Sequence, residues 1–244
     1  MVSPKPWQLE SVLRLAGRIA LCFAVGILTA SVLRHLLGEK FFEASLLNLV
    51  VAALTMQIGV LVMAALFLRE HATNWTQAFG FKNQPGWAVT LGIAVAVLVV
   101  PAMWALQRLS ADALLRLGFD VQEQDAVRLL REAHDLGGRM LIGVMAVAVA
   151  PLVEEVFFRG ILYPFARQNG SRGFALASVS VFFALIHGNI AIFAPLVFLA
   201  VVLALLYEWT DNLLACIIVH GLFNAANFAM LFILKNSGQL PGSP

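Results

Sequence analysis

Long apolar segments separated by short polar ones restrict most strongly how this 244-residue chain can fold. About seven segments emerge, most of them near the ~20 residues that an α-helix needs to cross a bilayer. They are residues 15–37, 44–68, 87–107, 140–162, 173–187, 190–207 and 213–234. The sequence therefore predicts an all-α, polytopic membrane helix bundle of about 7 transmembrane helices, or 8 if another crossing lies in residues 108–139.

The composition agrees with a membrane protein, because 61% of the residues are hydrophobic and only 12% are charged, whereas soluble domains carry about 25% charged residues. The net charge of +2 is small, so we expect no nucleic-acid partner, and we expect membrane lipid and a membrane-associated peptide or protein substrate. No A-x-A-like cleavage site follows the first apolar segment, which we expect to be retained as a span. These features suit a multi-pass protein of the bacterial inner membrane.

The chain divides by its motifs into two parts of one membrane domain. Residues 1–139 hold three spans and a mixed polar and apolar segment, 108–139, whose spacing predicts two short amphipathic helices at the membrane interface. Residues 140–234 hold the remaining four spans. Pro101 is expected to kink the third span. Basic residues in the short loops favour a cytoplasmic N-terminus.

The fourth span carries the sequence Glu154-Glu155-Val-Phe-Phe-Arg159. An ionisable residue at bilayer depth costs roughly 2.5–3.5 kcal/mol, so such residues indicate a functional site. Glu155 and Arg159 are four residues apart, which favours an ion pair along one helix face. Glu154 points about 100° away from Glu155 and is therefore the carboxylate available for chemistry. Pro151 should kink this helix and can open a polar cavity.

Two further motifs interrupt the late spans. Phe183 lies one helical turn before His187, and His220 lies one turn before Asn224. A single histidine in a membrane helix is most often a hydrogen-bonding group between helices. Three polar positions on three helices of one bundle can instead face a common cavity. We therefore predict that Glu154, His187, His220 and Asn224 converge.

These motifs together resemble those of the CPBP family of intramembrane proteases, also called the CAAX prenyl protease 2 or Abi family. The resemblance rests on Glu154-Glu155…Arg159, Phe183…His187 and His220…Asn224 in that order, and it covers about residues 140–234. It implies an intramembrane endopeptidase with Glu154, Glu155, Arg159, His187, His220 and Asn224 as its catalytic residues. Members of the family also serve in bacteriocin self-immunity and as scaffolds, so the resemblance does not name the substrate.

The chemistry of peptide hydrolysis suits these residue types. The reaction needs an activated water, stabilisation of the oxyanion and a proton for the leaving amine. Glu154 and His187 can hold and deprotonate the water, and His220 and Asn224 can donate hydrogen bonds to the oxyanion. Cys216, in an apolar run like Cys22, is expected to be an inert packing residue and not a nucleophile.

A metal is the open question at this stage. Glu154, His187 and His220 could supply three zinc ligands and leave the fourth position to water. The chain has no His-Glu-x-x-His sequence, and members of the resembled family are described both as metalloproteases and as metal-independent glutamate proteases. We favour activation of the water by Glu154 and His187 without a tightly bound metal.

Two other functions compete with proteolysis. One is a non-catalytic membrane adaptor or bacteriocin-immunity protein of the same fold, and the other is a proton-coupled transporter, because buried carboxylates and histidines also form proton relays. An adaptor would be expected to lose at least one motif residue, and a transporter to show two related halves. The motifs are complete and no repeat is evident, so the sequence favours the protease.

Overall fold

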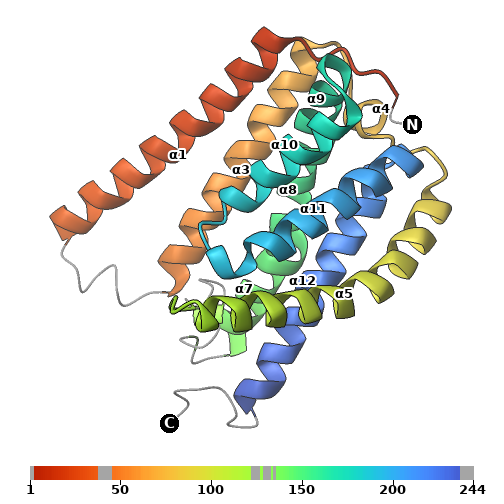
Figure 1. The fold of residues 1–244 in the computed structure, drawn as a ribbon. Coiled ribbons are helices and arrows are strands. Elements are labelled where there is room, and N and C mark those ends of the chain that lie inside the picture. Colours follow the sequence, from red (N-terminus) through yellow and green to blue (C-terminus); the bar gives the residue numbers. More distant parts are fainter. Residues whose placement is uncertain (1–2, 38–45, 122–126, 129–132, 134–135, 237–244) are drawn as a thin grey trace.

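The computed structural model describes residues 3–37, 46–121, 127–128, 133 and 136–236. These residues form helices and turns, with no strand among them, and Figure 1 shows the helices packed into one bundle. In chain order the elements are α1 (Leu9–Leu37), α3 (Leu46–Glu70), α4 (Trp75–Phe79), α5 (Pro85–Arg116), α7 (Leu136–Val144), η1 (Met145–Val149), α8 (Ala150–Glu155), η2 (Val156–Leu162), α9 (Tyr163–Asn169), α10 (Arg172–Leu185), α11 (Ile190–Thr210) and α12 (Leu213–Asn236).

Within the described residues, five helical stretches are long and apolar enough to cross a membrane. They are Leu9–Leu28, Pro85–Arg116, Leu136–Asn169, Ile190–Thr210 and Leu213–Ile233. Helix α10, expected as a span, has only 14 residues, and the side chains of residues 46–55 in α3 lie outside the described part. The chain is therefore an all-α integral membrane protein, whereas the predicted number of about seven spans is not confirmed.

The first of the two amphipathic helices expected in residues 108–139 is not a separate element. Helix α5 continues without interruption to Arg116, because no glycine or proline lies between Pro101 and Gly118 to end it. It ends where Gly118 takes a positive φ of 81°, a conformation that glycine adopts without strain. Figure 1 shows that this long helix is bent, and Pro101 inside it removes one backbone hydrogen bond. The second expected helix lies largely outside the described residues.

Small residues bring α5 and α12 close together. Ala88, Gly92 and Ala96 lie four residues apart on the buried face of α5. A methyl group added at Gly92 would come within 3.0 Å of the Ala215 carbonyl oxygen of α12. Since lipid tails are as apolar as leucine, membrane helices associate mainly through this kind of close packing. The stripe therefore fixes α12, which carries His220, against α5.

Burial differs greatly between the helices of the bundle. In an apolar 18-residue stretch of α11, 50% of the residues are buried, whereas in that of α1 only 17% are. Helix α1 packs against α3 at the edge of the bundle (Figure 1). Cys216 is fully buried, and its thiol donates to the Leu203 carbonyl at 3.2 Å. This is the packing role expected for that cysteine.

The segment before α1 crosses one end of the bundle (Figure 1). Ser3 and Lys5 contact the Asp211 carboxylate between α11 and α12, and burial lowers the pKa of Lys5 while Asp211 partly opposes that effect. The buried Trp7 indole donates to the Gly160 carbonyl in η2 at 3.3 Å. The N-terminal segment thus ties the helix that carries the Glu-Glu motif to the rest of the bundle.

Candidate functional site

The helix that carries Glu154 and Glu155 departs from α-helical geometry on both sides of them. The π-helical segment η1 precedes α8, and η2 follows it. In η1 the Ala150 N–H donates to the Met145 carbonyl, five residues back instead of four. The buried Pro151 lies just after this turn. Such π-helical turns are rare and occur frequently at functional sites.

Pro151 also leaves a backbone carbonyl for α12 to bind. A π-helical bond to the Ala146 carbonyl would need the N–H five residues later, but that residue is Pro151, which has none. The Asn224 side-chain amide supplies the donor at 2.8 Å. One turn before it, Gly221 allows the close approach, because a Cβ there would lie 2.9 Å from the Val147 carbonyl oxygen. Proline and glycine together therefore seat α12 on η1 and orient Asn224.

Glu155 is the centre of a fully buried polar network. Its side chain is 0% exposed, and one carboxylate oxygen, Oε1, accepts from Arg159 Nη1 and from His220 Nδ1, both at 2.8 Å. The Arg159 guanidinium is also buried and lies 4.5 Å from the centre of the Phe183 ring, within range of a cation–π contact. Glu155 therefore holds both the arginine of its own helix and the histidine of α12.

His187 stands at the break between α10 and α11. Its Nδ1 lies 2.7 Å from the Phe183 carbonyl oxygen, which can only accept, so Nδ1 carries the hydrogen and a neutral ring keeps its lone pair on Nε2. Nε2 is 4.0 Å from Glu154 Oε2. The next residue, Gly188, has a positive φ of 61°, which lets the chain turn sharply after the histidine.

His220 approaches Glu154 from the opposite helix. Its Nε2 is 3.8 Å from Glu154 Oε2, while its Nδ1 is held by Glu155. Glu154 is half-buried, and its Oε2 has no hydrogen-bond partner within the described residues. An unpaired buried carboxylate oxygen between two imidazoles is costly, which indicates a place for a water or a ligand.

Glu154, His187, His220 and Asn224 line one cavity of about 340 Å³, at the lower end of the ~300–1,000 Å³ of ligand sites. Its other lining residues are Gln107, Val127, Ile142, Ala146, Ala150, Ile192, Leu196, Phe223, Asn227, Phe228, Met230 and Leu231. The structure thus brings together the four side chains that were predicted to converge. Glu155 and Arg159 lie behind them, in the protein interior.

Two polar residues of this cavity, Gln107 and Asn227, were not singled out from the sequence. Asn227 accepts a hydrogen bond from the Trp104 indole of α5 at 2.7 Å. The signal that could have found it is its spacing, seven residues after His220 and three after Asn224, which places it on the same face of α12.

The arrangement does not fit the zinc ligands considered from the sequence. Tetrahedral zinc with bonds of ~2.0–2.1 Å holds its ligand atoms about 3.3 Å apart. Glu154 Oε2 is 4.0 Å from His187 Nε2 and 3.8 Å from His220 Nε2. No group of three histidine, cysteine, aspartate or glutamate side chains in the described part of the chain could hold a metal ion. These three side chains are therefore not placed as zinc ligands.

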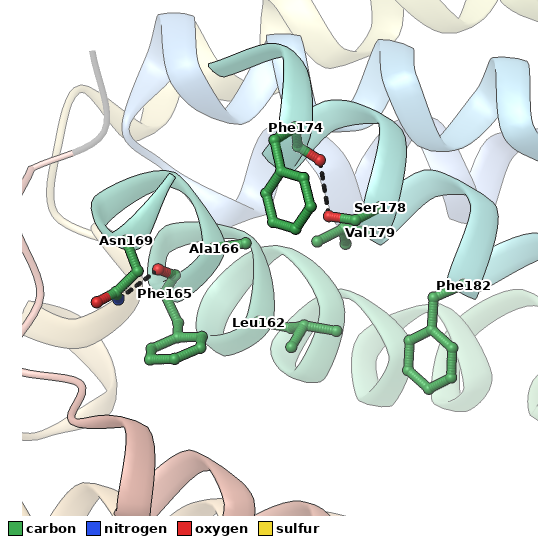
Figure 2. A pocket seen from close by; sticks show the side chains of 8 residues that line it. All are labelled: Leu162, Phe165, Ala166, Asn169, Phe174, Ser178, Val179 and Phe182. Carbon is green, nitrogen blue, oxygen red and sulfur yellow. Dashed lines mark hydrogen bonds between the residues drawn. The ribbon is translucent and has the colours of Figure 1, made fainter. Parts of the chain in front are cut away.

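A second pocket lies between α9 and α10 and is drawn in Figure 2. Its lining residues are Leu162, Phe165, Ala166, Asn169, Phe174, Ser178, Val179 and Phe182. No titratable side chain is among them, and the polar groups of Asn169 and Ser178 already donate to backbone carbonyls of their own helices (Figure 2). This pocket therefore offers neither a base nor an acid.

The fold and the site define an integral membrane helix bundle with a buried carboxylate–histidine cluster. Residues 137–226 match the family model of the type II CAAX prenyl endopeptidase Rce1-like proteins, so this part of the chain is similar to that family. The family resemblance expected from the motifs is confirmed. No curated protein and no solved structure matched the chain.

Proposed function

We propose that the chain is an intramembrane endopeptidase that hydrolyses a peptide bond of a membrane-associated protein or peptide, with Glu154 as the general base. The observation that carries the proposal is one cavity into which a carboxylate, two imidazoles and an amide converge. The family match over residues 137–226 supports it. The description of that family makes a prenylated CAAX peptide the first substrate to test.

A water molecule between Glu154 and His187 would be the nucleophile. Glu154 Oε2 and His187 Nε2 are 4.0 Å apart. With hydrogen bonds of about 2.8 Å to both atoms, the angle at the water oxygen is about 91°, so the water can direct one O–H to each acceptor. Its lone pairs then face away from both residues, towards a carbonyl carbon held in the cavity.

His220 and Asn224 would stabilise the oxyanion. His220 uses its Nδ1 hydrogen for Glu155, so Nε2 can donate only when the ring is protonated. Asn224 spends one amide hydrogen on Ala146 and keeps the second for the oxyanion.

Glu155 and Arg159 would be positioning residues in this scheme. Glu155 lies behind the imidazole of His220 and shares one carboxylate oxygen between that ring and the guanidinium. It can therefore fix the direction of His220 Nε2 without touching the substrate. Phe183 packs against the guanidinium and also lies 4.8 Å from the His187 ring, between ring centres.

The bond changes follow from these roles. Glu154 takes a proton from the water as the new C–O bond forms, and the carbonyl oxygen becomes an oxyanion held by His220 and Asn224. The C–N bond then breaks, and Glu154 returns the proton to the leaving amine nitrogen. The products are a carboxylic acid and an amine, and the enzyme is restored without any further reactant.

The experiment compares membrane peptides from cells that express the wild-type chain or Glu154→Gln. Loss of a general base should lower cleavage by ~10²–10⁴-fold, so fragments should appear with the wild type alone. Glu10→Gln is the matched control, since Glu10 is exposed and pairs only with Arg14 within the described residues. Identical fragment patterns for the wild type and Glu154→Gln would contradict the proposal and favour a non-catalytic adaptor.

A further inference from the structure

The cavity extends along α12 beyond the proposed catalytic residues. His220, Asn224 and Asn227 are spaced at i, i+4 and i+7, which places the three side chains within about 60° of arc on one helix face. All three line the cavity. Asn227 lies about 4.5 Å farther along the helix axis than Asn224, and it faces Trp104 of α5.

Trp104 fixes which end of the Asn227 amide faces the cavity. The indole N–H donates to Asn227 Oδ1 at 2.7 Å, and an indole can only donate. The oxygen end is therefore held by Trp104, and the NH₂ end is the one left for a ligand. Within the part of the chain that the structure describes, this NH₂ group donates to no protein atom.

The orientation of the other side-chain amide in the cavity is not fixed in this way. Gln107 lies one turn after Trp104 on α5 and also lines the cavity, but no hydrogen bond within the described residues fixes its orientation, so it can present either its oxygen or its nitrogen. Asn227 is thus a defined hydrogen-bond donor in a cavity whose walls include the apolar Leu196, Phe223 and Phe228.

We propose that Asn227 is a substrate-positioning residue that donates a hydrogen bond to a backbone carbonyl of the bound peptide, next to the scissile bond. The inference rests on the proposed function. An extended peptide rises ~3.3 Å per residue, so for a peptide that lies along α12 an offset of about 4.5 Å corresponds to a carbonyl one or two residues from the scissile one. A backbone carbonyl is present in every peptide, so this contact would set register without requiring a particular side chain.

The test is a coupling measurement between Asn227 and single backbone carbonyls. The probes are prenylated peptides ending in a CAAX sequence, in which one amide at a time becomes an ester, a weaker acceptor. Purified wild type, Asn227→Leu and Asn227→Asp are compared for cleavage, and for binding of the same peptides with an uncleavable scissile bond. Asn227→Asp keeps the Trp104 contact but turns an acceptor towards the substrate. Asn169→Leu is the matched control, because it removes an amide outside the cavity.

We expect Asn227→Leu to weaken binding and kcat/KM about three- to tenfold, as loss of one hydrogen bond does, and Asn227→Asp to weaken them at least as much. One ester, one or two residues from the scissile bond, should weaken wild-type binding and have little further effect in Asn227→Leu. A merely structural role would give equal ester effects in all variants, and that result would overturn the inference.

The two proposals fail in different ways. Cleavage that persists in Glu154→Gln would contradict the proposed base, while the ester coupling at Asn227 would still be measurable by binding. Normal Glu154-dependent cleavage with unchanged binding in Asn227→Leu would overturn only the role of Asn227. A wild-type chain that neither binds nor cleaves the probe peptides would overturn both.

Discussion

Replacing Glu155 with glutamine should destabilise the protein far more than the same change at Glu154. The Glu155 side chain is 0% exposed, and its Oε1 accepts from two groups at 2.8 Å. Glutamine has nearly the same shape but no charge, so Arg159, only 1% exposed, would keep its charge without a counterion. Removing one partner of a buried ion pair costs ~3–5 kcal/mol.

This cost converts into a measurable temperature shift. For a chain of this length, 1 kcal/mol lowers the midpoint of unfolding by roughly 2–4 °C, so Glu155→Gln should lower it by roughly 6–20 °C in detergent. Glu154→Gln serves as the control, because its half-buried side chain forms no short hydrogen bond with any described residue. Its unfolding temperature should stay close to that of the wild type.

A double variant separates stability from activity. Arg159→Met combined with Glu155→Gln removes both charges of the pair, and apolar replacement of a whole buried pair is often neutral or stabilising. We expect the double variant to regain most of the unfolding temperature but little cleavage, since His220 would still lack its carboxylate partner. If Glu155→Gln unfolds at the wild-type temperature, the buried network described above does not exist in the protein.

Three further predictions concern the backbone around the site and the metal. Gly221→Ala should cost about 1–3 kcal/mol and reduce cleavage, because its Cβ would press on Val147; Gly173→Ala, which meets no neighbour, should do neither. Gly188→Ala should cost about 1–2 kcal/mol through its positive φ and displace His187, seen as a lower kcat in a cleavage assay. A chelator should leave turnover unchanged at equilibrium, and a loss that added zinc restores would contradict the metal-free scheme.

The local parts of the site could be predicted because they depend on positions within one helix. The ion pair of Glu155 with Arg159 follows from their spacing of four residues. The bond between Glu155 and His220 joins residues 65 positions apart. It depends on how α8 crosses α12, where Gly221 allows the close approach of α12 to η1. The pattern of a single chain contains no signal for that crossing, and the catalytic roles stay predictions.

The lengths of the helices were predicted less well than their existence. Charged residues after position 107 suggested that the third span ended there, whereas α5 continues to Arg116. Charge ends the favourable environment of a span but does not by itself break a helix, and glycine and proline are the strongest local breaks. Helix α10 is shorter than its apolar run. The run was expected to be helical to residue 187, whereas α10 ends at Leu185 and the chain turns at Gly188.

The most direct test of the central claim is cleavage by the purified chain in lipid vesicles made with ¹⁸O-labelled water. The substrate is a peptide identified by the membrane comparison, and the products are weighed by mass spectrometry. With the wild type, we expect one ¹⁸O atom in the new C-terminal carboxyl group. We expect Glu154→Gln to unfold at the same temperature as the wild type and to release no product. Equal cleavage by Glu154→Gln, or a product without the label, would contradict a water activated by Glu154.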